Sequence, residues 1–202
     1  MDEAKLIRYA QQGDLNSFNR LVIKYQDMVY NQAYRVMGET FSAEDATQNS
    51  FVSAFRKIRS FRGGSFKSWL LRIVTNECYD ELRRRKRKPA IPLEPDYHNG
   101  KEVESPHWVV DPSESPEDYA LRDELSGAIQ NCLNKLPFEF RIVIVLVDIQ
   151  GFHYSEAADT LRKPVGTIKS RLARARLGMR ECLMGFWELL PSSFRLENEK
   201  AQ

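Results

Sequence analysis

The sequence predicts an all-α protein made of two small helical domains that a flexible acidic linker joins. Three observations predict this. Apolar residues recur at helical spacing through most of the chain. Basic residues are concentrated in two blocks, on either side of a proline-rich and acidic stretch at residues 89–114. A short helix, a turn and a basic helix follow one another over residues 154–176, which is the order of a helix-turn-helix.

The first ninety residues are expected to be helical. Residues 21–36 carry a single apolar stripe at helical spacing, and Gly38 ends it. Ser42 is expected to cap the next helix, because two acids follow it in the first turn, where the helix dipole favours them. A glycine-containing loop at residues 60–66 then leads into a helix over about residues 67–86.

The second half of the chain is also expected to be helical. Residues 89–114 hold five prolines and little apolar periodicity, which is typical of a linker. Ser115 and Pro116 predict the start of the next helix, and Pro137 its end. Residues 138–149 are dense in β-branched residues, which favour a strand. We still expect a buried helix there, since a lone strand would leave its backbone groups unpaired.

The charge distribution favours a polyanion as the partner. The net charge is only +2, but residues 56–88 contain 12 basic and 3 acidic residues. Residues 162–180 contain 7 basic residues and no acid. Two basic blocks separated by an acidic segment are typical of a protein that binds nucleic acid. The alternative interpretation is that both blocks are solvated helix faces.

The cysteines and the hydropathy predict a cytoplasmic protein. Cys78, Cys132 and Cys182 are far apart and show no CxxC spacing. We expect each to be a small buried hydrophobe in a reducing compartment, without a disulfide. No apolar run reaches membrane-spanning length, and the first residues lack the apolar stretch of a signal peptide, so no membrane insertion is expected.

The downstream basic block predicts a helix that reads duplex DNA. Arg and Lys can pair with guanine edges or phosphates, and Ser and Thr with phosphate oxygens. Pro164 fixes the entry of the helix, and Arg171 is expected on its outward face. The expected DNA contacts are Thr167, Lys169, Ser170, Arg171, Arg174 and Arg176. The alternative is a basic amphipathic helix that only packs and solvates.

The upstream basic block combines aromatic and positive side chains around a loop. Such a mixture suits the unstacked bases of a single strand. Phe66 is expected to stack on a base or to shape its pocket. The alternative for both Phe66 and Trp69 is a place in the core, and for Trp69 this alternative is favoured. The candidate contacts are Phe61, Arg62, Phe66, Lys67, Trp69, Arg72, Asn76, Arg83 and Arg84.

These segments, taken in order, resemble the extracytoplasmic-function (ECF) sigma factors of bacterial RNA polymerase, a branch of the sigma-70 family. The resemblance extends from about Leu6 to Cys182. It is carried by FNRLVIKYQDMVYNQAYRVMG, SAEDATQNSFVSAFRKIRSFRGGSFKSWLLRIVTNECYDELRRRKRKP, SPEDYALRDELSGAIQNCLNKLP and YSEAADTLRKPVGTIKSRLARAR. Each motif alone is modest, but four of them in this order are highly specific.

The resemblance implies a division of the chain. It implies a sigma-2 domain at residues 1–88, a linker at 89–114, a sigma-4 domain at 115–182 and a tail of unknown role at 183–202. Sigma-2 would bind the β′ clamp helices of core RNA polymerase and melt the minus-ten element. Sigma-4 would bind the β flap and read the minus-thirty-five element in promoter DNA. The implied polymerase contacts are Asp45, Gln48, Asn49 and Phe51.

Other consequences of the resemblance concern partners and departures. An anti-sigma factor is implied as a further partner, and no cofactor is implied. Gln48-Asn49 stands where the family often has Gln-Glu, which removes one carboxylate facing β′. His153 stands where a capping Ser is common, so Ser155 is expected to cap the following helix instead.

Two rival functions belong to other classes. A one-component transcription regulator would explain the helix-turn-helix but would leave the upstream aromatic and basic residues without a role. An enzyme such as a metal-dependent nuclease or deaminase would need a metal site. Only His98 and His107, among acids in the linker, suggest one, and no HExxH or CxxC spacing occurs. We therefore expect a protein that is not an enzyme.

Overall fold

The computed structural model describes residues 2–87 and 116–191. All regular elements in these two ranges are helical. They are α1 (Glu3–Gln11), α2 (Leu15–Met37), α3 (Thr40–Lys57), η1 (Ile58–Ser60), α4 (Phe66–Arg87), α5 (Pro116–Lys135), α6 (Phe138–Ile144), η2 (Val145–Ile149), α7 (Tyr154–Leu161), α8 (Val165–Leu183) and η3 (Met184–Leu189). The all-α class that the sequence predicts is confirmed for this part of the chain. The expected linker, with His98 and His107, lies outside the described residues.

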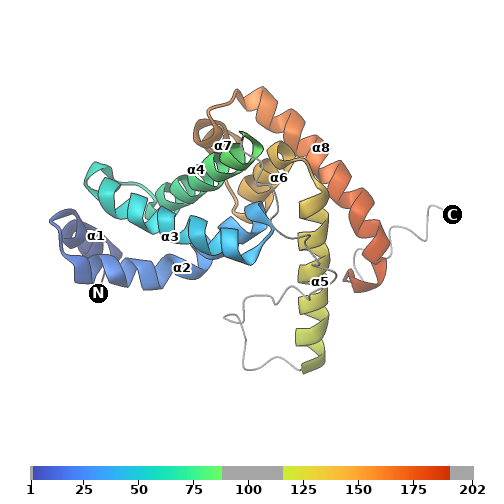
Figure 1. The fold of residues 1–202 in the computed structure, drawn as a ribbon, viewed down its shortest axis with the longest axis horizontal. Coiled ribbons are helices and arrows are strands. Elements are labelled where there is room, and N and C mark those ends of the chain that lie inside the picture. The colour runs from blue at the N-terminus through green and yellow to red at the C-terminus, as the bar shows by residue number, and fades with distance from the viewer. Residues whose placement is uncertain (1, 88–115, 192–202) are drawn as a thin grey trace.

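The helices form two groups that touch each other (Figure 1). Helices α1–α4 pack together at one end of the molecule, and α5–α8 at the other. The long helix α8 runs along the outer side of the second group, beside α5 and α6. The groups meet where α4 contacts α7 and where α2 contacts α5, α6 and η2.

Helix α2 shows why the local sequence folds as it does. The Asp14 carboxylate accepts hydrogen bonds from the backbone N–H groups of Asn16 (3.3 Å) and Ser17 (3.0 Å). These bonds satisfy two donors that a helix start leaves unpaired, and they lower the pKa of Asp14. Gly38 ends the helix with a φ of 81°, a left-handed conformation that favours glycine. The end that the sequence predicts at Gly38 is confirmed.

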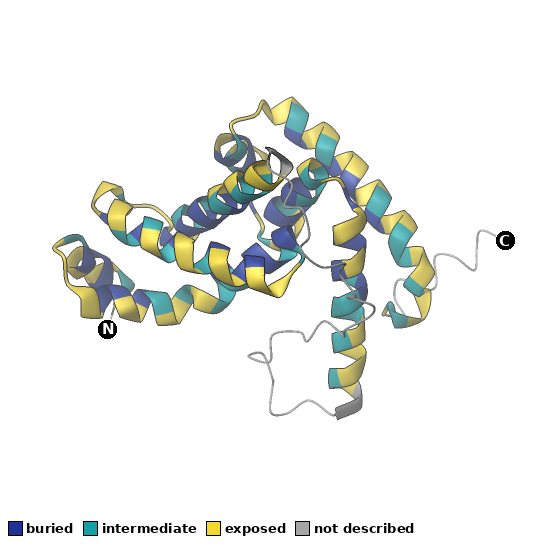
Figure 2. Cartoon of the chain, viewed as in Figure 1, coloured by how far each residue is buried: buried dark blue, intermediate teal, exposed yellow. Residues whose placement is uncertain are grey.

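The buried apolar residues form one cluster that extends from the first group of helices into the second. In the first group, Leu71 and Val74 of α4 are fully buried, and in the second, Leu146 and Ile168 are fully buried. Figure 2 shows buried positions concentrated on the facing sides of the helices, with exposed positions along the outer side of α8. The amphipathic helices therefore present their polar sides to solvent.

The start of α3 differs from the expectation. The helix begins at Thr40, with Glu39 rather than Ser42 at the N-cap position. Ser42 is buried one turn inside the helix, where its hydroxyl contacts Glu39 and accepts a hydrogen bond from Arg85 of α4. Ser42 thus ties α3 to α4. The sequence shows a capping pattern but not this partner, which lies 43 residues away.

The β-branched segment at residues 138–149 is helical, as expected. Helix α6 passes directly into η2, a π-helical segment, and Val145 and Leu146 are completely buried at the junction. Residues 142–146 are all buried, which explains their apolar composition without a strand. A π-helical turn leaves the regular ladder of hydrogen bonds, and here Gly151, with a φ of 75°, ends the helical run soon after it.

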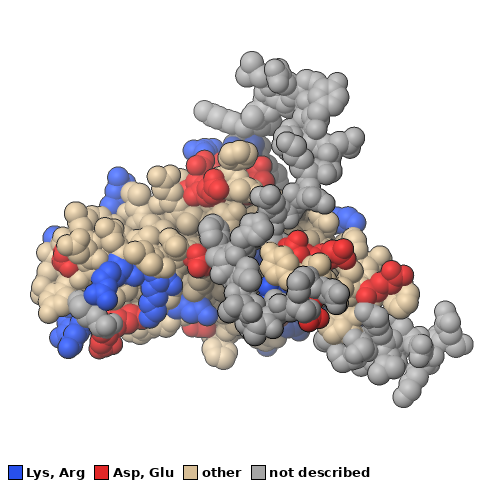
Figure 3. Space-filling model, turned by 90° about the horizontal axis from the view of Figure 1, so that it is seen from below, with Lys and Arg blue, Asp and Glu red and all other residues tan. Residues whose placement is uncertain are grey.

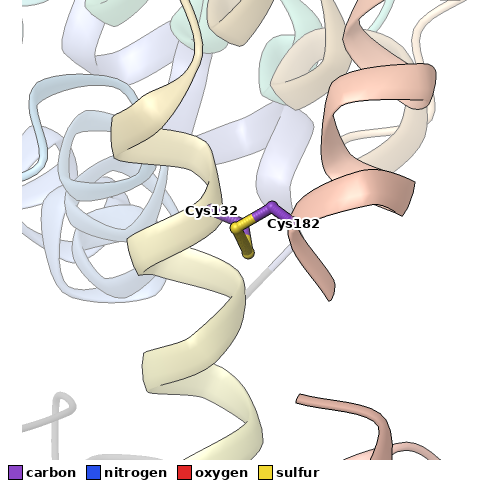
Figure 4. Close-up of a disulfide and its surroundings, with 2 residues drawn as sticks. All are labelled: Cys132 and Cys182. Carbon is purple, nitrogen blue, oxygen red and sulfur yellow. A yellow bond between two sulfur atoms is a disulfide. The ribbon is translucent and has the colours of Figure 1, made fainter. Parts of the chain in front are cut away.

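The cysteines depart from the expectation of three free thiols. Cys132 of α5 and Cys182 of α8 form a disulfide, with their Cα atoms 5.6 Å apart (Figure 4). The sequence expectation missed this pair because 50 residues separate the two positions. Cys78 is a free and buried thiol, as expected, and burial raises its pKa to about 12.

Within the described residues, no helix has the length and apolar character needed to span a membrane.

Candidate nucleic-acid interface

Helices α7 and α8 form the helix-turn-helix, and the turn between them has an unusual backbone. Arg162 ends α7 with a φ of 51°, a left-handed conformation that costs a non-glycine residue about 1–2 kcal/mol. Pro164 stands at the N-cap of α8, so it fixes the entry of that helix as expected. At the start of α7 the carboxylate of Glu156 accepts a hydrogen bond from the His153 backbone N–H (2.9 Å). Ser155 lies inside the helix and does not occupy the cap position.

The inner face of α8 fixes which residues point outward. Ile168, Leu172, Ala175 and Met179 are buried at a spacing of three or four residues. Lys169, Ser170, Ala173, Arg174, Arg176 and Arg180 are exposed. The exposed face is therefore cationic, with small residues between the charges.

Three predicted DNA contacts on α8 lie on the exposed face without an ionic partner among the described residues. The Lys169 ammonium lies 5.8 Å from the centre of the Tyr154 ring, a cation–π contact that holds it near the start of α7. The Ser170 hydroxyl donates to the Thr167 carbonyl (3.0 Å). Arg174 extends from the same face and makes no ion pair within residues 2–87 and 116–191. Lys169 and Arg174 are thus free to neutralise phosphates or to reach base edges.

The two other arginines of the predicted set are engaged with acids of the same domain. Arg171 is only 19% exposed and forms an ion pair with Glu139 of α6, so the expectation of a fully outward side chain is wrong. The Arg176 guanidinium makes two hydrogen bonds to the Asp148 carboxylate, of 2.9 and 2.7 Å. These bonds raise the pKa of Arg176. Sequence reasoning missed Glu139 and Asp148 because neither lies on the helix-turn-helix.

The upstream loop is held at both ends. The side-chain amide of Gln11, at the end of α1, donates to the carbonyls of Ile58 (3.1 Å) and Phe61 (2.8 Å). Ser65 accepts a hydrogen bond from the Ser68 backbone N–H (3.2 Å) and so caps α4. Gln11 is a positioning residue that sequence reasoning missed. A glutamine at the end of a helix gives no indication in the sequence that it binds a loop about 50 residues away.

Three aromatic residues at the loop and the start of α4 form a cluster in which each ring contacts the other two. The ring centroids of Phe61, Phe66 and Trp69 lie 5.3 to 5.5 Å apart, in tilted or edge-to-face arrangements. Phe66 is 3% exposed, so it belongs to the core and does not contact a base directly. Phe61 and Trp69 are partly exposed above it. The burial of Phe66 contradicts direct stacking on a base and agrees with the alternative of a place in the core. A role in shaping the base pocket beneath the exposed rings stays a prediction.

The remaining upstream candidates follow the loop along α4. Arg62 and Lys67 are exposed beside the aromatic cluster, and Asn76, Arg83 and Arg84 are exposed further along the helix. Arg72 is partly buried, and Arg84 pairs with Glu81 one turn away. Figure 3 shows patches of Lys and Arg on the end of the molecule formed by α1–α4.

A cleft of about 390 Å³ lies between α4 and the helix-turn-helix. Asn76 and Arg83 line one wall, and Arg162 and Lys163 line the other. The structure thus brings part of the predicted upstream DNA-binding surface next to the turn of the helix-turn-helix, which the sequence did not indicate.

Helix α3 carries the predicted polymerase contacts. Asp45, Gln48 and Asn49 are exposed, whereas Phe51 is half-buried against the core. Two apolar side chains that sequence reasoning missed lie on the same helix, since Phe41 is 81% exposed and Val52 is 44% exposed. Spacings of four, three and four residues place Phe41, Asp45, Gln48 and Val52 on one helix face. Exposed apolar and polar side chains on one face are typical of a protein-binding surface.

Comparison with known families identifies both halves of the chain. Sigma-70 region 2 matches residues 21–88, and Sigma-70 region 4 matches residues 126–178. The ECF RNA polymerase sigma factor SigW of Bacillus subtilis is 36% identical over 186 residues, which cover 89% of this chain and 95% of SigW. The chain belongs to the ECF sigma factors. Region 2 of this sigma factor falls on α2–α4, and region 4 on α5–α8.

Other relatives agree with this placement. The ECF RNA polymerase sigma factor SigE of Mycolicibacterium smegmatis is 37% identical over 172 residues, and the matched part spans 85% of this sigma factor and 63% of SigE. Among solved structures, RpoE in complex with the anti-sigma factor NepR from Bartonella quintana superposes with a TM-score of 0.63 at 25% identity, covering 84% of this chain and 98% of RpoE. CnrH in complex with the cytosolic domain of CnrY superposes with a TM-score of 0.58 at 26% identity, covering 89% and 96%.

Proposed function

We propose that this sigma factor binds core RNA polymerase and directs it to promoters by melting the minus-ten element and reading the minus-thirty-five element. In this proposal residues 1–88 form sigma-2, residues 89–114 the linker and residues 115–182 sigma-4. Membership of the family supports transcription initiation at specific promoters. The observation that carries the finer proposal is the exposed cationic face of α8 in a helix-turn-helix, where Lys169 and Arg174 have no ionic partner among residues 2–87 and 116–191.

In sigma-2, the proposed polymerase surface is the exposed face of α3. Asp45, Gln48 and Asn49 offer hydrogen-bonding groups to the β′ clamp helices, and Phe41 and Val52 add apolar area. Removing apolar area from water stabilises a complex by roughly 25 cal/mol per Å². The apolar pair therefore supplies affinity, and the polar groups supply specificity.

The proposed melting surface is the loop at residues 61–65 with the exposed face of α4. Phe61 and Trp69 present aromatic edges above the buried Phe66, and Arg62 and Lys67 provide positive charge for the backbone of one strand. Binding unstacked bases favours the open strand without hydrolysis of a nucleotide, because it offsets an unstacking cost of a few kcal/mol. Asn76, Arg72, Arg83 and Arg84 extend this surface along α4.

In sigma-4, Lys169, Ser170 and Arg174 are the proposed duplex contacts, with Thr167 beside them. Arg171 and Arg176 act first as positioning residues, since their ion pairs hold α8 against α6 and η2. We also propose that an anti-sigma factor binds this chain, because the solved structure of the similar protein RpoE is a complex with the anti-sigma factor NepR.

Transcription in vitro with purified core polymerase tests the proposal. Core enzyme with this sigma factor is expected to initiate at discrete sites on genomic templates, and start mapping yields both promoter elements at once. Arg174→Ala is expected to weaken initiation by about 1–3 kcal/mol in promoter affinity. Arg180→Ala, one and a half turns further along α8 and also exposed, is the matched control. Absence of specific initiation on all templates would refute the proposed function.

A further inference from the structure

The last residue of α1 reaches the loop that precedes α4. Gln11 lies at the carboxyl end of α1, and its side-chain amide nitrogen donates to the carbonyls of Ile58 (3.1 Å) and Phe61 (2.8 Å). A glutamine amide carries two N–H groups in one plane, so each carbonyl receives one of them. The two acceptors lie 47 and 50 residues further along the chain. The contact therefore joins the first helix to the entry of the loop.

The loop that Gln11 holds has few bonds of its own. The Phe61 carbonyl lies just beyond η1, where a helix leaves its last carbonyls without partners inside it. Gly63 and Gly64 follow with φ values of 104° and 85°, left-handed conformations that glycine adopts without strain. Across the described residues, the backbone N–H groups of residues 62–64 make no hydrogen bond to another backbone group. The path of the loop therefore depends on contacts from outside it.

Phe61 connects this contact to the proposed melting surface. Its ring centroid lies 5.5 Å from that of the buried Phe66 and 5.4 Å from that of Trp69. Phe61 and Trp69 are the partly exposed members of the cluster. A shift of the Phe61 backbone moves its ring relative to Trp69 and so changes the surface that the two rings present. By holding the Phe61 carbonyl, Gln11 fixes one side of that surface.

Helix α1 gives Gln11 a fixed position. Three of its apolar residues are buried against the core, namely Leu6, Ile7 and Ala10. Near the other end of the helix, Glu3 accepts a hydrogen bond from the Tyr25 hydroxyl (2.6 Å), and the Tyr25 ring centroid lies 5.6 Å from that of Phe66. Helix α1 thus supports the aromatic cluster twice, through the loop backbone and through the residue beneath Phe66.

We propose that Gln11 is a positioning residue that determines which base the minus-ten loop prefers. Both of its N–H groups are used on loop carbonyls, so it acts through Phe61 and does not contact the base itself. This inference rests on the proposed function, because it names the residue that sets the shape of the proposed melting surface. The hold on the loop is a property of the free chain and is tested separately.

Two substitutions remove the donors and keep the length of the side chain. Gln11→Met presents no polar N–H group to the two carbonyls, and Gln11→Glu presents only acceptors, which repel them. Gln12 is the next residue and is exposed, so Gln12→Met and Gln12→Glu are matched controls for size and charge. Circular dichroism and urea titration of the full chain establish that each variant is folded.

Hydrogen exchange in the free chain measures the hold on the loop. Backbone amides of residues 61–65 are expected to exchange faster in both Gln11 variants, because the loop opens more often without its donors. The Gln12 variants are expected to exchange like the unsubstituted protein. Equal exchange at these amides in the Gln11 variants and the unsubstituted protein would overturn the positioning role.

Base preference is measured in holoenzyme. Single strands that span the minus-ten element of a mapped promoter carry each of the four bases in turn at every position and compete for binding. The ratio of affinities for the preferred base and the others is expected to fall about 3- to 10-fold in the Gln11 variants, the size expected for the loss of one hydrogen bond. The ratio is expected to stay unchanged in the Gln12 variants.

The ratio separates positioning from a general loss of structure. A loosened fold weakens binding of every strand alike, so an equal loss for all bases, or an unchanged ratio, would overturn the proposed role of Gln11. Absence of any base preference in unsubstituted holoenzyme would overturn the proposed melting surface and the specificity role with it. Hydrogen exchange in the free chain would then still decide whether Gln11 holds the loop.

Discussion

Single acids next to α8 determine which of its arginines have an ionic partner within the second group of helices. Glu139 pairs with Arg171, and Asp148 pairs with Arg176, so the charges of both arginines are partly neutralised within the domain. Lys169 and Arg174 keep their charges for an external partner. The spacing of charges along α8 cannot show which of its basic residues are paired and which are not, because the acids come from other elements.

The pair of Arg171 and Glu139 leads to a test with opposite outcomes for two roles. If Arg171 positions α8, Glu139→Ala weakens promoter binding by holoenzyme by roughly 0.5–1 kcal/mol, as Arg171→Ala does. If Arg171 contacts DNA, Glu139→Ala releases it and binding stays equal or becomes tighter. We expect the first outcome in a gel-shift titration. Glu124→Ala, which removes an exposed acid from α5, controls for net charge.

The backbone of Arg162 predicts a gain in stability from glycine. Its φ of 51° strains any residue with a Cβ, and glycine adopts it freely. Arg162→Gly is expected to raise the free energy of unfolding by about 0.5–1 kcal/mol in urea titrations. Arg162→Ala removes the same charge but retains the strain, so it is expected to bring no gain. An equal gain in both variants would attribute the effect to charge.

At the scale of elements, the disulfide joins the first and last long helices of the second domain. The bond between Cys132 and Cys182 closes a loop of 50 residues. Constraining such a loop in the unfolded chain stabilises the fold by about 2–4 kcal/mol. Addition of a thiol reductant is therefore expected to lower the free energy of unfolding by that amount. Cys182→Ser is expected to show no response to reductant, and a response of equal size there would contradict the assignment.

Helix α1 is attached to α2 through Glu3. The Tyr25 hydroxyl donates to the Glu3 carboxylate (2.6 Å), and Lys24 pairs with it. Hydrogen bonds from Lys24 and Tyr25 lower the pKa of Glu3 from its ordinary value of 4.5. A lowered folded pKa means that the stabilisation is present above pH 4.5 and is lost as pH falls through the lowered value.

Glu3→Gln is therefore expected to cost about 0.2–1 kcal/mol of unfolding free energy at neutral pH. Below the lowered pKa it is expected to cost nothing, because the carboxyl group is then protonated in both proteins. Urea titrations at the two pH values measure the difference. A cost that is independent of pH would attribute the effect to packing of the side chain rather than to its charge.

The sequence predicts the elements well and their partners poorly. The sequence pattern was sufficient to predict the helix ends at Gly38 and Pro137 and the helical state of residues 138–149, because these depend on local chemistry. Ser42 and Arg171 were misplaced because each is determined by a contact from another element, namely with Arg85 and with Glu139. The pairing of Cys132 with Cys182 likewise depends on how α5 packs against α8.

At the scale of the whole molecule, the packing of α4 against α7 places like charges opposite each other. Lys57 and Arg83 from one group of helices and Arg162 and Lys163 from the other line a single cleft, with Asp80 as the acid on its wall. Their repulsion opposes this packing. Hydrogen bonds from Arg35 to Ser126 and from Arg141 to the Val36 carbonyl favour it. These bonds are partly buried and go to neutral acceptors, so salt affects them less than it affects the repulsion.

Salt is therefore expected to bring the two groups of helices of the free protein closer together. Charge repulsion in the cleft acts over about 30 Å at 0.01 M salt and about 10 Å at 0.1 M. The radius of gyration from small-angle X-ray scattering is expected to decrease between these two salt concentrations. Lys163→Glu replaces repulsion by attraction across the cleft, so it is expected to be compact at both, whereas Arg8→Glu on α1 keeps the salt response. Because ordinary salt effects on a flexible chain would alter both variants alike, a loss of response in Lys163→Glu alone locates the repulsion in this cleft.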